Sequence, residues 1–424
     1  MTMRSLFNRY KEEIIVSSIF MFFALGFNVY RVQSDGVYYY AILEGILHLP
    51  GSLSAHIHGF HQAGCVFFNL PFYLAAYFTE LFLKVSLHSN GITLRQVSIN
   101  LASNFYMLMS ILMTIRILKS LKLKSILLPV ISILFSTSAF SVSVLMPSFT
   151  HAVDIFVNTL IVYFILKSNK SERSAFWLGM IYVVSILVRY ANFVFAFPLL
   201  LYFIFCGEWK KMKFFSLGLL SSGWIIALVF YFYNGNAFLP YDINSSGTVQ
   251  TIVNLPHWPR FLLNTLFNPV HGLFIWSPVT IISILGLAVM PKEIKKTGYL
   301  FLGLWLAIVI FYGYMYFWSA GWSFSNRLLS GLFAIYVIGL SAVIERYGRK
   351  IACLVILLTF YSIILYLNWQ LCIFNAEFGT PGDMVTAWIK GESATSMDKV
   401  VNIKTFLQRL WVMCRYKYIL RFMR

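Results

Sequence analysis

Acidic residues are scarce in this chain, which has 15 Asp and Glu side chains among 424 residues. Charged residues of both signs make up 11% of the sequence, whereas hydrophobic residues make up 59%. A soluble domain of this length needs many more charged side chains on its surface, so the composition excludes that class. The scarcity also makes each carboxylate informative, because acid–base chemistry on this chain has few residues from which to draw.

Cysteine is equally rare, and its five residues show neither the spacing of a disulfide framework nor that of a zinc site. The net charge of +18 is typical of a nucleic-acid-binding protein only at first sight. The basic residues cluster in short segments between apolar runs, which is the pattern of cytoplasmic loops in membrane proteins. No nucleic-acid-binding module is recognisable in the sequence, so we expect no nucleic-acid partner.

Long apolar runs recur along most of the chain and predict an all-α polytopic membrane protein, because helices satisfy their own backbone hydrogen bonds in lipid. The runs predict about eleven membrane-spanning helices, at 14–30, 99–118, 125–145, 152–167, 175–188, 192–206, 214–233, 271–290, 299–317, 328–344 and 351–368.

The basic clusters orient these helices with a cytoplasmic N-terminus, because positively charged loops stay inside. A large first external loop then covers 31–98, and a second external loop covers 234–270. Residues 1–370 form the transmembrane domain, and 371–424 form a tail of unknown role. The basic clusters lie at 4–11, 116–124, 167–173, 210–213, 292–296 and 346–350.

The apolar run 64–85 does not fit this orientation as a full crossing. Counting it as a span would move the basic cluster 116–124 to the outside and invert every later loop. We therefore predict a re-entrant or surface-lying helix within the first external loop.

Two carboxylates are the best candidates for a general base at the outer face. Asp35 follows the first apolar run, and Asp154 begins a later one. Glu44 is expected to be a solvated residue that points away from Asp35. Glu80 is expected to pair with Lys84, four residues further along the same helix.

Further polar and aromatic residues gather at the outer ends of the predicted spans, where ionisable groups are costly and therefore candidates for function. Arg189 and Arg327 are candidate phosphate-binding residues, since a guanidinium matches phosphate oxygens with a fork of donors. The candidate substrate-binding residues at these ends are His151, Asn192, His271, Trp318 and Trp322.

The first external loop also contains histidines and aromatics that bear on a substrate. His58 and His61 lie in His56-Ile-His-Gly-Phe-His61, which has the histidines of a metal site without an acidic or cysteine partner beside them. We therefore assign them to substrate contact or to a polar loop and predict no metal site. Tyr38 and Tyr39 follow Asp35 closely in the chain and are candidates for stacking on a sugar ring.

These features together resemble the GT-C superfamily of integral membrane glycosyltransferases, which includes the protein O-mannosyltransferases and the bacterial aminoarabinose transferase. The chain is similar to an uncharacterised bacterial branch in three segments within roughly residues 1–370. The segments are Ser34-Asp-Gly-Val-Tyr-Tyr-Tyr40, Asn268-Pro-Val-His-Gly-Leu-Phe-Ile-Trp-Ser-Pro278 and Trp318-Ser-Ala-Gly-Trp-Ser-Phe-Ser-Asn-Arg327.

The resemblance implies a transferase that moves a sugar from a polyprenyl-phosphate donor to a glycan, lipid or protein acceptor. It implies that Asp35 is the base, that Asp154 assists, and that Arg189 contacts the donor phosphate. Many members carry two adjacent acids where this chain has Ser34-Asp35-Gly36, which weakens a metal-dependent mechanism. No cofactor is required, although a divalent metal stays open. The location implied is a bacterial inner membrane, with the active site on the periplasmic face.

Two other functions stay open from the sequence. A lipid-linked polysaccharide polymerase or ligase would depend on Arg189, Arg327 and His271 and would not need Asp35. A polysaccharide or lipid transporter would be expected to show inverted repeats or charged residues in the middle of the membrane, and neither is visible.

Overall fold

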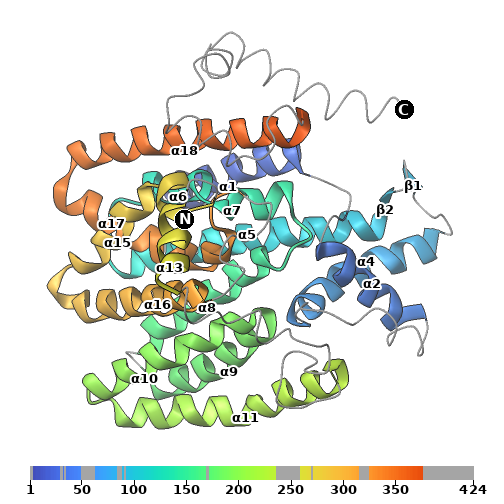
Figure 1. The fold of residues 1–424 in the computed structure, drawn as a ribbon, viewed down its shortest axis with the longest axis horizontal. Helices are drawn as coiled ribbons and strands as arrows, with labels where there is room; N and C mark the ends of the chain where they lie inside the picture. The colour runs from blue at the N-terminus through green and yellow to red at the C-terminus, as the bar shows by residue number, and fades with distance from the viewer. Residues whose placement is uncertain are drawn as a thin grey trace.

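The computed structural model describes residues 3–28, 32, 35–48, 63–83, 88–89, 92–168, 171–234, 258–268, 271–314 and 324–375. The fold is a bundle of helices with one short hairpin (Figure 1). The α-helices are α1 (Met3–Phe27), α2 (Asp35–His48), α4 (Gly64–Leu83), α5 (Leu94–Ser120), α6 (Leu127–Ser136), α7 (Ser138–Phe140), α8 (His151–Ser168), α9 (Glu172–Val188), α10 (Ala196–Phe205), α11 (Trp209–Asn234), α13 (Trp258–Phe267), α14 (Leu273–Trp276), α15 (Val279–Ala288), α16 (Lys295–Tyr314), α17 (Phe333–Tyr347) and α18 (Arg349–Asn375).

The remaining elements are short. They are the π-helical turn η1 (Ser141–Leu145), the 3₁₀ helices η2 (Tyr190–Phe195), η4 (Lys292–Ile294) and η5 (Arg327–Leu332), and the strands β1 (His88–Ser89) and β2 (Ile92–Thr93). The two strands pair antiparallel, with His88 opposite Thr93, and lead directly into α5. Thr93 caps α5, because its hydroxyl accepts a hydrogen bond from the backbone N–H of Gln96 at 3.1 Å.

Seven helices among the described residues are long and apolar enough to cross a membrane, or eight if the bent pair 127–136 and 138–145 forms one span. The protein is therefore an all-α, multi-pass membrane protein. The expected count of about eleven is not confirmed. The predicted span 192–206 is occupied by Tyr190–Phe205, a shorter apolar helix whose first part is 3₁₀. The predicted span 271–290 contains a break between α14 and α15.

Two further segments differ from simple spans. The predicted span 125–145 bends by 71° between α6 and the α7–η1 segment. In contrast, α4 in the predicted re-entrant stretch is an unbroken apolar helix of 20 residues and has the length and composition of a span. The re-entrant or surface-lying placement of this helix stays a prediction from the charges of the loops.

The centre of the bundle is α17, whose residues are nearly all buried, whereas α18 and α11 lie at opposite edges of the bundle (Figure 1). The helices that pack most closely do so through glycines. A Cβ on Gly286 of α15 would lie 1.9 Å from the backbone oxygen of Gly339 on α17. A Cβ on Gly218 of α11 would lie 2.1 Å from the backbone oxygen of Phe176 on α9. Small residues let helix backbones approach in this way, which is a common device of membrane helices.

The helix α2 lies at one end of the bundle beside α4, and α4 packs along the first half of α5 (Figure 1). Aromatic contacts hold α4 to α5, including Phe68 with Tyr106 at 5.4 Å between ring centroids. The hydroxyl of Tyr106 also donates a hydrogen bond to the backbone oxygen of Phe68 at 2.7 Å. This corner of the fold positions the first residues of α2, which carry Asp35.

Candidate functional site

The starts of four helical elements carry the polar residues singled out by the sequence. Asp35 is the first residue of α2, and His151 is the first residue of α8. Arg189 immediately precedes η2, and Arg327 is the first residue of η5. The structure brings these four segments together, although they are far apart in the chain.

A buried ion pair forms the inner part of the site. Arg189 Nη1 lies 3.1 Å from Asp154 Oδ2, and their side chains are 6% and 1% exposed. The guanidinium also lies 5.3 Å from the ring centroid of Tyr312. Because two opposite charges are taken out of solvent together, each one needs the other to offset its desolvation.

Both oxygens of the Asp154 carboxylate accept hydrogen bonds from neighbouring side chains. Its Oδ1 accepts hydrogen bonds from Asn192 Nδ2 at 2.8 Å and from Asn158 Nδ2 at 2.9 Å. Its Oδ2 accepts from Arg189 at 3.1 Å. A carboxylate that is satisfied by three donors is well suited to hold Arg189 in place and poorly placed to accept a proton from a substrate.

His151 connects the buried pair to the outer part of the site. Its Nδ1 lies 3.2 Å from Arg189 Nη1. A guanidinium can only donate, so Nδ1 must be the acceptor and carries no proton in this arrangement. His151 is therefore neutral here, with its proton on Nε2.

A second, more open ion pair joins Asp35 and Arg327. Arg327 Nη2 lies 3.7 Å from Asp35 Oδ2, and the two side chains are 16% and 38% exposed, respectively. The guanidinium carbon lies 4.7 Å from the ring centroid of Phe149. Within the described part of the chain, Arg327 Nε is buried and makes no hydrogen bond. Arg327 therefore has a donor that is not used by the described residues.

The two neighbouring tyrosines of α2 differ in exposure. Tyr38 is 47% exposed, so its ring is accessible for stacking, whereas Tyr39 is 3% exposed. Burial raises the pKa of the Tyr39 phenol well above its usual range, and the nearby Asp35 carboxylate adds to this shift. The phenol, which is hydrogen-bonded to Thr150, is therefore neutral. The expected stacking on a sugar ring fits Tyr38 and does not fit the buried ring of Tyr39.

The backbone turns sharply just before Arg327. Ser325 has φ of 52°, a left-handed conformation that non-glycine residues rarely adopt. Its hydroxyl lies 3.0 Å from that of Ser277, and the Asn326 side chain caps η5 by accepting from the N–H of Leu328 at 3.1 Å. These contacts hold a strained turn that aims Arg327 towards Asp35.

Gly331 of η5 packs directly on the buried pair, which leads to a first prediction. A Cβ at this position would lie 2.5 Å from both Asn158 Nδ2 and Asp154 Oδ2. Both atoms are held by hydrogen bonds, so we expect Gly331→Ala to destabilise the protein by about 1–3 kcal/mol through overpacking. The measurement is the thermal unfolding midpoint of the purified protein in detergent.

The matched control is Gly223→Ala in the peripheral helix α11. A Cβ at Gly223 would meet nothing within 4 Å, so alanine is expected to be neutral or slightly stabilising there. Equal midpoints for Gly331→Ala and the wild type would contradict the packing described around Asp154.

The remaining candidates from the sequence are placed as follows. Asn192 donates to Asp154, as described, and also to the backbone oxygen of Ser185 at 3.1 Å. His271 is 7% exposed and precedes α14. His58, His61, Trp318 and Trp322 lie outside the described residues.

Several residues that complete the site were not among the candidates. Asn158 lies four residues after Asp154 on α8, and this helical spacing is a signal that the sequence contained. Phe149, Tyr312 and Gly331 had no such signal, because their contacts come from segments distant in the chain.

The described residues contain no group of three or more His, Cys, Asp or Glu side chains arranged to hold a metal ion. No protein-family model matches the chain, and the curated proteins and solved structures showed no match either.

Proposed function

We propose that the protein is an integral membrane glycosyltransferase that moves a sugar from a polyprenyl-phosphate-linked donor to an acceptor hydroxyl. The observation that carries the proposal is the Asp35–Arg327 pair, in which an accessible carboxylate lies beside a guanidinium whose Nε makes no hydrogen bond to the described residues. The cation suits the phosphate of a donor, and the carboxylate suits the proton of an acceptor.

The proposed reaction is a single displacement at the anomeric carbon. Asp35 accepts the proton of the acceptor hydroxyl while the hydroxyl oxygen forms a bond to that carbon. The bond from the anomeric carbon to the phosphate oxygen breaks, and polyprenyl phosphate leaves with the bonding electron pair. Arg327 stabilises the negative charge that grows on the phosphate. One displacement inverts the anomeric configuration, and the transition state has oxocarbenium character.

Each ion pair has a separate role in this proposal. Arg327 binds the phosphate, whereas Arg189 is too enclosed by Asp154, His151 and Tyr312 to contact it directly. Both arginines were expected to bind the phosphate, and this proposal assigns the direct contact to Arg327 alone. Asp154 is then a positioning residue that acts through Arg189, not the assisting acid expected from the sequence.

The finer points of the proposal come from the sequence. The basic loops favour a cytoplasmic N-terminus and place the site on the external face, which would be the periplasmic face of a bacterial inner membrane. The eleven predicted spans would require the bent pair, the shorter apolar helices at 190–205 and 279–288, and also α1 and α9 to cross the membrane. The proposed acceptor is a glycan, lipid or protein hydroxyl that reaches Asp35.

The test is transfer of labelled sugar from a set of polyprenyl-phosphate donors to a pool of lipid and glycan acceptors by the purified protein in nanodiscs. Transfer by the wild type supports the proposal. Absence of transfer from every donor, with a cooperative unfolding transition showing a folded protein, would overturn it and favour a polymerase, ligase or transporter.

The phosphate role of Arg327 gives a second prediction. Arg327→Gln is expected to raise the Kd for polyprenyl phosphate by roughly ten- to a hundred-fold, because hydrogen bonds to charged groups contribute about 1.5–3 kcal/mol. The Kd of Arg327→Lys should lie between those of the wild type and Arg327→Gln, since lysine keeps the positive charge and loses the forked pair of donors. Binding can be measured by quenching of tryptophan fluorescence.

The control for this prediction is Arg346→Gln in the last turn of α17. Arg346 is exposed and donates to the backbone oxygen of Val289 at 3.3 Å, at the opposite end of the same helical segment. An equal loss of binding in both variants would show that the effect is one of general charge and not of a phosphate site at Arg327.

A further inference from the structure

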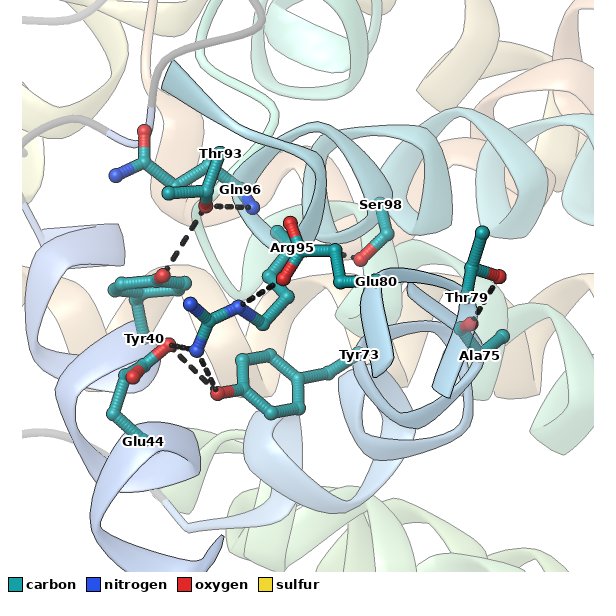
Figure 2. Close-up of polar contacts among 10 residues, drawn as sticks. All are labelled: Tyr40, Glu44, Tyr73, Ala75, Thr79, Glu80, Thr93, Arg95, Gln96 and Ser98. Atoms are coloured by element: carbon teal, nitrogen blue, oxygen red, sulfur yellow. Dashed lines mark hydrogen bonds and ion pairs between the residues drawn. The ribbon is translucent and has the colours of Figure 1, made fainter. Parts of the chain in front are cut away.

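A second cluster of charged residues lies between α2, α4 and α5, at the end of α2 that is distant from Asp35 (Figure 2). Arg95 of α5 lies at its centre. Its Nη1 lies 2.6 Å from Glu44 Oε1 on α2, and its Nε lies 2.9 Å from Glu80 Oε2 on α4. Tyr73 of α4 donates to the same Glu44 oxygen at 2.7 Å. We refer to Glu44, Tyr73, Glu80 and Arg95 as the Arg95 cluster.

These contacts correct the expectation for Glu44, which is ion-paired with Arg95, and they give Glu80 a partner that the sequence did not predict. Glu80 was expected to pair with Lys84, and Glu44 was expected to be solvated. Arg95 pairs with both carboxylates, because α4 packs against α5 and α2 packs against α4. Lys84 itself lies outside the described residues.

Arg95 contributes positive charge to two acids at once. Glu44 and Glu80 lie on different helices and both pair with its guanidinium, and their side chains are 30% and 11% exposed, respectively. Without Arg95, like charges would face each other across the interface between α2 and α4. Repulsion between partly buried charges is screened less by salt than repulsion between surface charges.

The helix α2 connects the Arg95 cluster to the site, because it carries both Glu44 and Asp35. Asp35 and Glu44 are nine residues apart on α2, which corresponds to about 13 Å along a helix. At its first turns, α2 contacts the segment before α8, because Gly36 packs against Ser148 and Tyr39 is hydrogen-bonded to Thr150. A helix of this length moves as a unit, so displacement at Glu44 tilts the end that carries Asp35.

The Asp35–Arg327 pair is sensitive to such a tilt. The two charged atoms are already 3.7 Å apart, so a small movement of α2 separates them. In enzyme sites a misplacement of about 1 Å can lower the rate by about a hundred-fold.

We propose that Arg95 is a positioning residue that holds α2 against α4 and thereby sets the position of the Asp35 carboxylate relative to Arg327. The role in catalysis rests on the proposed function, whereas the positioning of α2 can be measured without it. Arg95 touches no substrate in this proposal. It acts through Glu44 and through α2, the helix that begins at Asp35.

The protein offers a matched control at the other end of α5. Lys119 also lies between two carboxylates on a neighbouring helix, 3.1 Å from Glu12 and 2.8 Å from Glu13 of α1. Removing either cation takes one charged partner from two acids, but of these two cations Arg95 is the one that contacts the helix carrying Asp35. A purely stabilising role would make Arg95→Gln and Lys119→Gln behave alike.

The experiment compares Arg95→Gln, Lys119→Gln and the triple variant Arg95→Gln/Glu44→Gln/Glu80→Gln in the full chain in nanodiscs. Spin labels at Val37 on α2 and Leu101 on α5, both exposed, report the distance between these helices after the five native cysteines are replaced by alanine. Sugar transfer gives kcat and KM, and binding of polyprenyl phosphate is measured separately.

We expect Arg95→Gln to shift or broaden the spin-label distance and to lower kcat by about ten- to a hundred-fold, with the Kd for polyprenyl phosphate little changed. Lys119→Gln should leave the distance and kcat unchanged. The triple variant also removes the negative charges of Glu44 and Glu80. Its activity and its spin-label distance should therefore return part of the way to the wild-type values.

An unchanged distance in Arg95→Gln, or an equal fall of kcat in Arg95→Gln and Lys119→Gln, would overturn the proposal. A shifted distance in a protein whose wild type transfers no sugar would support the positioning of α2 by Arg95. The same result would count against the glycosyltransferase function.

Discussion

Asp35→Asn is expected to lower sugar transfer by at least about 10²–10⁴-fold, the range that a general base contributes. Asparagine keeps the size of the side chain and cannot accept the proton of the acceptor hydroxyl. The loss should appear in kcat and not in the affinity for the donor. The measurement is initial-rate transfer from the polyprenyl-phosphate donor that is active with the wild type.

Two controls separate this effect from misfolding. The unfolding midpoint should change little, because a partly exposed ion pair at 3.7 Å contributes at most about 1 kcal/mol. Binding of polyprenyl phosphate should be retained or strengthened, since Arg327 loses the carboxylate that competes with phosphate. Transfer at the wild-type rate by Asp35→Asn would rule out this residue as the base.

Asp154→Asn and Arg189→Gln are each expected to destabilise the folded protein by about 3–5 kcal/mol, because each leaves a buried charge without its partner. The side chains are 1% and 6% exposed, so solvent cannot take over the lost interaction. In both variants the unfolding midpoint in detergent should fall strongly, and activity should be lost together with folding.

The pair Lys211–Glu208, whose carboxylate is exposed, provides the comparison for this prediction. Its atoms lie 2.9 Å apart, closer than those of the buried pair, but the Glu208 side chain is 41% exposed. Glu208→Gln is therefore expected to change stability by less than about 1 kcal/mol. Similar midpoints for Asp154→Asn and Glu208→Gln would contradict the burial of the Asp154–Arg189 pair.

Together these variants distinguish two kinds of acid in the site. Asp35→Asn is expected to slow the reaction and leave stability nearly unchanged. Asp154→Asn is expected to destabilise the fold and to lose activity as a consequence. The sequence treated both as candidate catalytic acids, because each lies at the end of an apolar run. Exposure and hydrogen-bond partners, which separate them, depend on the packing of segments that are far apart in the chain.

Much of the fold follows from local composition. The long apolar runs predicted helices such as α5, α8, α16 and α18, which the structure contains at nearly the expected positions. Where a proline interrupts an apolar run, the length of the run wrongly predicted one continuous helix. The predicted span 271–290 contains Ser277-Pro278 and breaks there, because proline lacks the N–H that a continuous helix needs.

The sequence by itself determined that this is an all-α membrane protein with few carboxylates, and that Asp35, Asp154, Arg189 and Arg327 are its unusual polar residues. These conclusions need only hydropathy and the cost of placing charge near lipid. The tertiary structure decided which arginine meets which acid, and that one pair is closed and the other open. It also decided that Arg95 joins α2 to α4, since ion pairs between helices depend on distances in space that no spacing along the chain specifies.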